Sequence, residues 1–369
     1  MLPAIDLFSG AGGLSIGATL AGADVRLLVD CDRVACDTVE ANLAWHPAAK
    51  VLCADVTDLT GTSLRCLAGL DSHDPLILVG GAPCQPFSKN AYWLDDGAES
   101  RYRRARARGM KGPRPAAALE ARPDDRRDLV QEFWRLVVEA EADGFVLENV
   151  RSILHPRNRP IVDGLLVAAT REGYDVRLVE ADATHYGVAQ RRQRVFVLGT
   201  RGARPEIPRR THSDEPGSSR LAPVVTSREV LAPFRSKHFF EPEELVEGRW
   251  AKHLQEIPPG WNYKYHSAWA GHPTPTFEAE TRFWNFLLKL DPGQPSWTIP
   301  ASPGPWVGPF HWDGRRLRTP ELAALQGFPT GYRFMGSRRE RVRQIGNAVP
   351  APMAQRMVEA VLCPVVGES

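Results

Sequence analysis

Short apolar stretches alternate with amphipathic ones over the first 200 residues of the chain. The apolar stretches are bounded by Gly, Pro or Asp, which is typical of buried strands, and the amphipathic stretches have the period of helices. Alternating strands and helices predict an α/β fold with a mostly parallel sheet and helices on both faces. The predicted strands are 3–8, 24–29, 51–54, 76–79, 144–147 and 194–199, and the predicted helices are 14–21, one that ends at 42, and 129–142.

The pattern changes after residue 203. Pro, Arg, Ser and Gly dominate 203–227, as expected of a linker or a surface excursion. Between Trp250 and Trp312 the chain holds seven of its ten tryptophans and has a sustained helical or strand period only over 283–290. We therefore expect a first domain over 1–204, a smaller irregular domain over 205–315 with the tryptophans in its core, and a C-terminal segment over 316–369 whose helical stretches, 320–326 and 350–362, return to the first domain.

Composition limits the class of protein further. The 369 residues are 43% hydrophobic and 24% charged, with no long apolar run and no signal sequence, so we expect a globular cytoplasmic protein. The six cysteines form no CxxC pair, which predicts free thiols, no disulfide framework and no metal site. The net charge is only +2, but the cations between Arg101 and Arg114 have no acid among them. Such a run forms either a solvated loop or a loop that contacts phosphates.

Glycines and acids follow several predicted strands, at the sheet edge where α/β proteins bind ligands. Gly10, Gly12 and Gly13 follow the first strand and would let a ligand approach the backbone closely. Asp30 follows the second strand, where an acid can accept both hydroxyls of a ribose. Asp55 follows the third strand, where it either binds an adenine amino group or caps a helix. Together they favour an adenosine-type cofactor, with a glycine spacing that is not GxGxxG.

Two more strand ends carry groups suited to covalent catalysis. Cys84 lies between Pro83 and Gln85 in a run rich in Gly and Pro, which predicts an exposed thiol and not a buried one. Its thiolate is a candidate nucleophile, provided that cations or a helix N-terminus lower its pKa. Glu148 follows another strand and is either an acid or hydrogen-bond donor of the site, or a helix N-cap.

With these residues the chain resembles the DNA (cytosine-5) methyltransferases. The similarity rests on five blocks in the order of that family, and on the segment Arg316–Phe334 before the last block. It implies the Rossmann-like α/β fold of S-adenosylmethionine-dependent methyltransferases with a smaller, irregular target-recognition domain. The blocks are DLFSGAGG (6–13), GAPCQPFS (81–88), ENV (148–150), QRRQRVF (190–196) and QIGNAVP (344–350).

The resemblance implies a role for each matched residue. Cys84 is expected to add to C6 of a cytosine, which makes C5 nucleophilic, while Glu148 holds N3. Arg192 and Arg194 are expected to face the base and the thiol, with Arg192 at the cytosine O2. The expected cofactor is S-adenosylmethionine, and no metal is expected. The expected cofactor-binding residues are Phe8 (near the adenine), Ser9, Gly10, Ala11, Gly12, Gly13, Asp30, Cys31, Asp55, Val56, Pro83, Asn347 and Ala348.

The resemblance also implies double-stranded DNA as the substrate, with the target cytosine flipped out of the helix. The basic insertion 89–128 follows the nucleophile, so we expect a mobile loop that closes over DNA. The domain 205–315 would recognise the target sequence. The expected DNA contacts are Gln85, Ser88, Arg101, Arg103 and Arg104, and Arg249, Lys252, Asn262, Lys264 and Lys289 are further candidates.

In its cellular role we expect a monomeric modification enzyme of a restriction-modification system, associated with the nucleoid and acting separately from a cognate endonuclease. The first alternative is an RNA cytosine-5 methyltransferase, which would share every catalytic residue; the long domain 205–315 favours DNA. A nicotinamide-dependent oxidoreductase is disfavoured by the absence of GxGxxG. A catalytically inactive homologue is disfavoured because Cys84, Glu148, Arg192 and Arg194 are all present.

Overall fold

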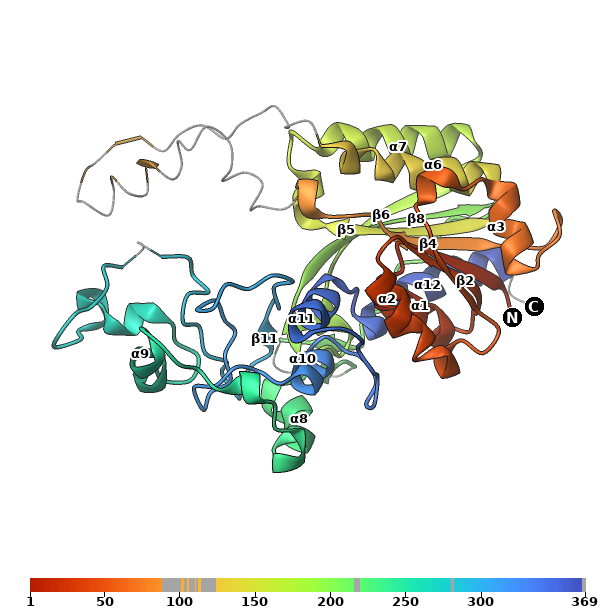
Figure 1. Ribbon diagram of the computed structural model, residues 1–369. Helices are drawn as coiled ribbons and strands as arrows, with labels where there is room; N and C mark the ends of the chain where they lie inside the picture. The colour runs from red at the N-terminus through yellow and green to blue at the C-terminus, as the bar shows by residue number, and fades with distance from the viewer. Residues whose placement is uncertain are drawn as a thin grey trace.

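A seven-stranded sheet forms the centre of the larger part of the molecule (Figure 1). The structure is a computed structural model that describes residues 1–87, 101, 102, 105, 110, 112, 113, 124–215, 220–279 and 282–366. The strand order is β3-β2-β1-β4-β5-β8-β6. The strands are β1 (Pro3–Leu7), β2 (Asp24–Asp30), β3 (Lys50–Cys53), β4 (Ile77–Gly81), β5 (Gly144–Val150), β6 (Tyr174–Asp182) and β8 (Gln193–Arg201).

The sheet is parallel except at one strand. From β3 to β5 each neighbouring pair is parallel, and β8 runs antiparallel to both β5 and β6. The predicted α/β class with a mostly parallel sheet is therefore confirmed. Strand β6 was not predicted, because its partly buried, charge-rich sequence lacks the apolar run of the central strands.

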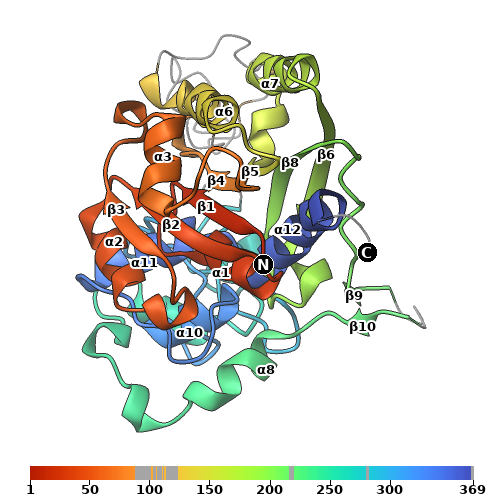
Figure 2. The same cartoon turned by 90° about the vertical axis from the view of Figure 1, so that its right-hand side faces the viewer.

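Helices cover both faces of the sheet (Figure 2). On one face, α3 (Gly61–Ala68), α6 (Leu129–Glu139) and α7 (Arg159–Arg171) enclose a core that includes Phe133 and Phe145. On the other face, α1 (Gly13–Leu20), α2 (Arg33–Glu40) and α12 (Ala351–Val366) enclose a second core. The C-terminal helix thus packs on the sheet that the N-terminal residues build. No helix in the described part of the chain has the length and apolarity needed to cross a bilayer.

Two further helices lie between the sheet and the smaller lobe, α10 (Thr319–Leu325) and α11 (Arg338–Asn347). Sequence periodicity did not predict α11, because most of its residues are polar. Its first turn is stabilised by a capping box, in which Ser337 and Glu340 satisfy each other's backbone amides. Ile345 anchors its C-terminal end in an apolar cluster that also contains Leu322 and Leu325 of α10.

The smaller lobe has little regular structure. Its core contains Leu254, Tyr263, Phe277 and Leu287. The periodic stretch 283–290 forms neither a helix nor a strand, only isolated bridges such as Phe286 to Val307. The boundaries at 204 and 315 remain predictions. Its short elements are β9 (His212–Ser213), β10 (Ala222–Pro223), α8 (Ser227–Leu231), α9 (Ala251–Glu256) and β11 (Ser296–Trp297), and β11 pairs with β7 (Gln190–Arg191).

The tryptophans of this lobe are not all core residues, so that prediction is wrong for four of the seven. The core of the lobe is filled by leucine, tyrosine and phenylalanine side chains, against which Trp250 and Trp306 pack at the edge. The other large indoles therefore stay at the surface. The exposed ones are Trp261 (43%), Trp269 (69%), Trp284 (52%) and Trp297 (42%).

The close packing of α1 on α12 yields a test of the fold. A Cβ atom on Gly17 would lie 2.4 Å from the Cβ of Ala354, so Gly17→Ala should lower the free energy of unfolding by about 1–3 kcal/mol. A Cβ atom on Gly164 in α7 would have no other atom within 4 Å. Gly164→Ala should therefore raise the free energy of unfolding by about 0.5–1 kcal/mol. Urea unfolding of both variants measures the difference; equal effects would contradict this packing.

Candidate active site

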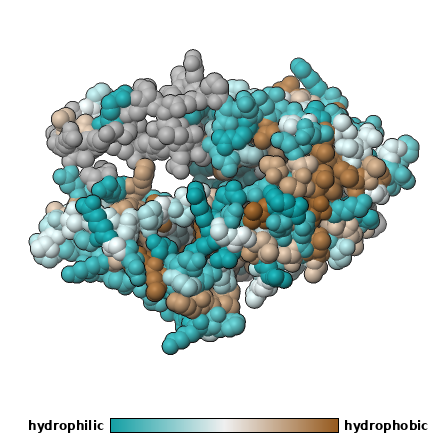
Figure 3. Space-filling view, viewed as in Figure 1, coloured by the Kyte–Doolittle hydropathy of each residue, from teal (hydrophilic) through white to brown (hydrophobic). Residues whose placement is uncertain are grey.

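A cavity of about 320 Å³ lies at the carboxyl ends of β1, β2, β4 and β5. The surface is hollowed near the middle of the face shown in Figure 3, between the sheet and the mostly hydrophilic lobe at left. Most of the predicted site residues meet here, although they come from both ends of the chain. Those that line the cavity are Phe8, Ser9, Gly10, Ala11, Gly13, Asp30, Cys31, Asp55, Val56, Pro83, Cys84, Gln85, Glu148, Arg194, Asn347 and Ala348.

The remaining predicted residues lie elsewhere. Gly12 and Arg192 do not line the cavity. Arg101 is exposed. Ser88, Arg103 and Arg104 lie outside the described residues, as does most of the insertion 89–128.

The turn from β1 into α1 forms one wall of the cavity. Phe8 has a φ of 59°, which is unusual for a large side chain and stores strain in the turn. Gly12 has a φ of 80°, and a Cβ atom there would lie 2.9 Å from the hydroxyl of Tyr332. Gly12 therefore allows the turn to close against Tyr332, and its neighbours provide the cavity wall.

Acidic side chains surround this end of the cavity. Asp30 accepts hydrogen bonds from the backbone amides of Gly10 at 2.7 Å and Asp32 at 2.8 Å, one on each carboxylate oxygen. Burial raises the pKa of Asp30, while these two amides act in the opposite direction. Asp55 accepts from the amide of Thr57 at 2.9 Å, so it caps a short helix and also lines the cavity.

This end of the cavity fits an adenosine-type cofactor. Each carboxylate oxygen of Asp30 keeps lone pairs free for ribose hydroxyls. Ser9 Oγ and Gln344 Oε1 are buried and have no hydrogen-bond partner within the described ranges, and both residues line the cavity. Unpaired buried polar atoms of this kind are costly unless a ligand or water satisfies them.

The other end of the cavity carries the predicted catalytic groups. Glu148 is 6% exposed and forms an ion pair with Arg194, whose Nε lies 2.8 Å from Glu148 Oε1. Cys84 follows β4 and its side chain is half-buried, less exposed than its sequence context predicted. Cys31, Cys36, Cys53, Cys66 and Cys84 have free thiols, as predicted for these five.

The charges at this end act on one another. Burial raises the pKa of the Cys84 thiol, and the neighbouring Glu148 raises it further. Arg194 and Arg192 act in the opposite direction without outweighing burial, so the pKa of Cys84 stays above its ordinary value and the condition that the sequence set for a nucleophilic thiol is not met by these two charges. Burial also raises the pKa of Glu148, whereas Arg194 and Arg192 act to lower it.

Arg192 lies behind the cavity, not at the position expected for a group that contacts the cytosine O2. It is 1% exposed, and its Nη2 donates to the carbonyl oxygens of Gly346 at 2.8 Å and Ala348 at 3.0 Å. Nη2 is thus bound to carbonyls at the end of α11, whereas Nε and Nη1 are buried and have no hydrogen-bond partner among the described residues. Arg194, two residues later on β8, is the arginine that reaches the cavity.

Among the cavity residues that the sequence did not predict, three have long polar side chains. Arg343 on α11 donates to Asp32 Oδ2 at 2.6 Å. Because the two residues lie 311 positions apart in the sequence, no local pattern predicts this contact. Gln344 begins the QIGNAVP block, so the block itself was the signal for it. Arg126 pairs with Asp124 at the end of the basic insertion.

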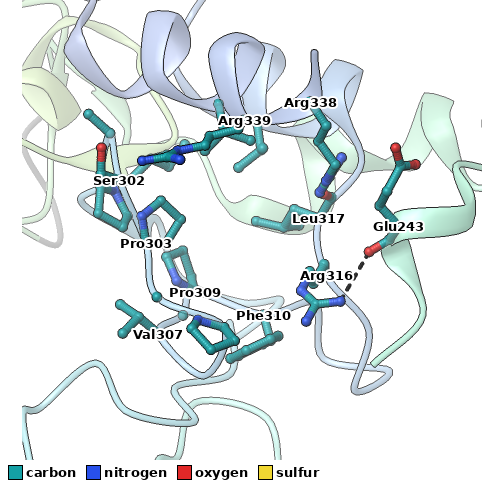
Figure 4. Close-up of a pocket in the computed structure, with 18 residues that line it drawn as sticks. Glu243, Ser302, Pro303, Val307, Pro309, Phe310, Arg316, Leu317, Arg338 and Arg339 are labelled. Carbon is teal, nitrogen blue, oxygen red and sulfur yellow. Dashed lines mark hydrogen bonds between the residues drawn. The ribbon is translucent and has the colours of Figure 1, made fainter. Parts of the chain in front are cut away.

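A second cavity, of about 480 Å³, lies on the other side of α11 (Figure 4). Arg338 and Arg339 extend into it from α11, opposite Pro309 and Phe310. Arg316 is held by the carbonyl oxygen of Glu243 at 3.2 Å. None of the predicted catalytic residues lines this cavity, so we assign the chemistry to the smaller one.

The fold is the Rossmann-like α/β fold of S-adenosylmethionine-dependent methyltransferases, in which ligands bind at the carboxyl ends of the strands. The model of the C-5 cytosine-specific DNA methylase family matches residues 2–363. The chain belongs to this family and is a C-5 cytosine-specific DNA methyltransferase.

The chain is similar in sequence or in fold to several individual proteins. The type II methyltransferase M.SacI of Streptomyces achromogenes is 34% identical over 98% of this chain and 93% of its own length. M.XorII of Xanthomonas oryzae is 27% identical over 95% and 82%. Among solved structures, one described as an E. coli prophage DNA modification methyltransferase has a TM-score of 0.68 at 23% identity, covering 98% of both chains. The S. pombe Dnmt2 methyltransferase has a TM-score of 0.56 at 14% identity, again over 98% of both.

The opposing effects of Glu148 and Arg194 on the thiol can be measured. Glu148→Gln removes the charge that raises the pKa of Cys84, so more thiolate should be present near neutral pH and alkylation by iodoacetamide should be about tenfold faster. Arg194→Gln should slow it by a similar factor. Site-resolved mass spectrometry separates Cys84 from the other thiols, and Arg151→Gln, at an exposed ion pair with Glu180, is the control. Shifts in the same direction for both variants would refute this electrostatic account.

Proposed function

We propose that the protein transfers a methyl group from S-adenosylmethionine to C5 of a cytosine flipped out of duplex DNA, through a transient bond between Cys84 Sγ and cytosine C6. The observation that supports this most strongly is the single cavity that Cys84, Glu148 and Arg194 share with Phe8, Asp30 and the other cofactor candidates. A nucleophile and a cofactor must meet at one base for such a transfer.

The cytosine ring explains why a thiolate is needed. C5 of cytosine is a weak nucleophile because the ring is electron-poor, and addition of Sγ at C6 turns C5 into an enamine-like carbon. In that step the Sγ–C6 bond forms and the electrons of the C5–C6 double bond move to C5. C5 then bonds to the methyl carbon while the bond from that carbon to the cofactor sulfur breaks, and the sulfur keeps the electron pair. The C5 proton then leaves, the C5–C6 double bond forms again and the Sγ–C6 bond breaks. No side chain is assigned to that proton.

Glu148 and Arg194 have complementary tasks in this scheme. Glu148 would hydrogen-bond N3 and the 4-amino group, where charge accumulates when the thiolate adds. Arg194 orients the Glu148 carboxyl through their 2.8 Å contact and stabilises the thiolate. Arg192 acts from behind the cavity as a positioning residue, since it binds the carbonyls on either side of Asn347.

The cofactor would occupy the opposite end of the cavity. Asp30 would bind its ribose, while Phe8, Cys31, Asp55 and Val56 would surround the adenine. Asn347 and Ala348 would close the cavity from α11. When bound, S-adenosylmethionine supplies the electrophilic methyl group.

The biological setting belongs to the same proposal. The substrate is double-stranded DNA. Because the cytosine is stacked inside the duplex, attack on C6 from above the ring requires that the base be extruded from the stack. Gln85 borders the cavity beside the nucleophile, where it would contact the DNA. We propose a monomeric, cytoplasmic modification enzyme of a type II restriction-modification system, whose cognate endonuclease acts separately.

Expression in a host without cytosine methylation tests this function. Sequencing that detects 5-methylcytosine should show one short motif methylated at one cytosine throughout the host genome. Cys84→Ser should lower the methylation rate by at least about a thousandfold, because a hydroxyl is far less acidic than a thiol. Cys66→Ser, on α3 and outside the cavity, should methylate like the parent.

Two results would refute the proposal. Methylation confined to RNA would replace the DNA substrate by RNA. A Cys84→Ser enzyme that methylates at the parental rate would remove the covalent step.

A further inference from the structure

Three exposed tryptophans of the smaller lobe and the half-buried Lys264 contact one another and form a surface, called here the tryptophan face: Lys264, Trp269, Trp284 and Trp297. The rings of Trp284 and Trp297 meet edge to face, with centroids 5.9 Å apart. The Lys264 ammonium lies 5.3 Å from the Trp269 ring centroid and 5.8 Å from that of Trp284. Large exposed aromatic groups gathered in this way commonly mark an interaction site.

The lobe holds this face in place. Asn262 is 2% exposed, and its Nδ2 donates to the carbonyl oxygen of Trp284 at 2.8 Å. Its Oδ1 accepts from the backbone amide of Lys264 at 3.0 Å. One buried amide therefore links the lysine to the central tryptophan. The burial of Asn262 also removes it from the candidates for a direct DNA contact, and Lys289, 3% exposed and bonded to the carbonyl of Gln255, is removed likewise.

The tryptophan face is continuous with the edge of the active site. Trp297 pairs with Arg191 where β11 meets β7. Thr298 Oγ1 donates to the carbonyl oxygen of Arg191 at 2.7 Å, which fixes this crossing. From Arg191 the chain runs directly into β8, where Arg194 reaches the cavity. Trp297 of the face is thus paired with Arg191, which precedes Arg194 by three positions along the chain.

We infer that the tryptophan face holds the duplex DNA substrate beside the extruded cytosine. This inference rests on the proposed function, because only a flipped base leaves its neighbours partly unstacked. The indole faces can pack on the exposed sugars and bases of that step, as aromatic side chains do where nucleic-acid stacking is interrupted. Lys264, kept between two rings, supplies the positive charge that a phosphate requires. Trp269, Trp284 and Trp297 are then substrate-binding residues, not the core residues that their sequence pattern predicted.

Binding measurements on the full-length protein test this inference. The parent enzyme first methylates plasmid DNA, so that sequencing defines its site, and a duplex with that site is the probe. The double variant Trp284→Ala with Trp297→Ala should raise the Kd for this duplex at least about tenfold, with S-adenosylmethionine affinity unchanged. The same positions changed to Phe should keep most of the affinity. Lys264→Gln should reduce the slope of log Kd against log salt by about one.

Phe240→Ala is the matched control, since this ring is 50% exposed and lies outside the tryptophan face. Parental DNA affinity in the double alanine variant would overturn the inference, as would a change only in oligomeric state, which would mean that the face binds protein. Equal losses of DNA and S-adenosylmethionine affinity in the Ala and Phe variants would show a purely structural role. If the parent enzyme methylates no DNA, the proposed function itself fails. That result is distinguishable from the binding outcomes above, which concern only the tryptophan face.

Discussion

The reversed strand β8 is the constraint on which the active site depends. It runs antiparallel to β5 with Val150 opposite Arg194, so Arg194 and Glu148 are diagonal neighbours on the same face of the sheet. A parallel strand would start at the other edge of the sheet and could not bring its first residues to this place. Arg194, in direct contact with Glu148, and Arg192 together offset part of the cost of burying this carboxylate. On the other side of β5, Gly81 of β4 leaves space, since a Cβ atom there would lie 3.3 Å from Glu148 Oε2.

Helix α11 unites the parts of the molecule that take part in the reaction. Arg343 binds Asp32 at the cofactor end, and Arg192 binds the carbonyl of Gly346 behind the catalytic end. The smaller lobe also packs closely on Gly346, because a Cβ atom there would lie 2.5 Å from the Cα of Ala301. A residue larger than glycine would push the lobe away. Helix α11 therefore contacts Asp32 beside the cavity, Arg192 behind it and Ala301 of the smaller lobe.

Local chemistry explains how much the sequence could predict. Glycines and acids after buried strands predicted the cavity end around Gly10 and Asp30, because parallel strands bring their carboxyl ends to one edge. Arg192 and Arg194 are both arginines in one block, and only the fold shows that one bonds backbone carbonyls while the other meets Glu148. Likewise, a tryptophan count cannot separate Trp306, which packs against the core of the lobe, from Trp284 at its surface. Such differences arise from tertiary packing, which local periodicity does not contain.

Trapping the enzyme on a duplex with 5-fluorocytosine at the target position tests the central claim most directly. Fluorine cannot leave C5 as a proton does, so the Sγ–C6 bond should persist after methyl transfer. The account predicts a stable protein–DNA adduct in the presence of S-adenosylmethionine, which peptide mass spectrometry assigns to Cys84. An enzyme that methylates the ordinary duplex but forms no adduct with the fluorinated one, or forms it at another residue, would contradict the account.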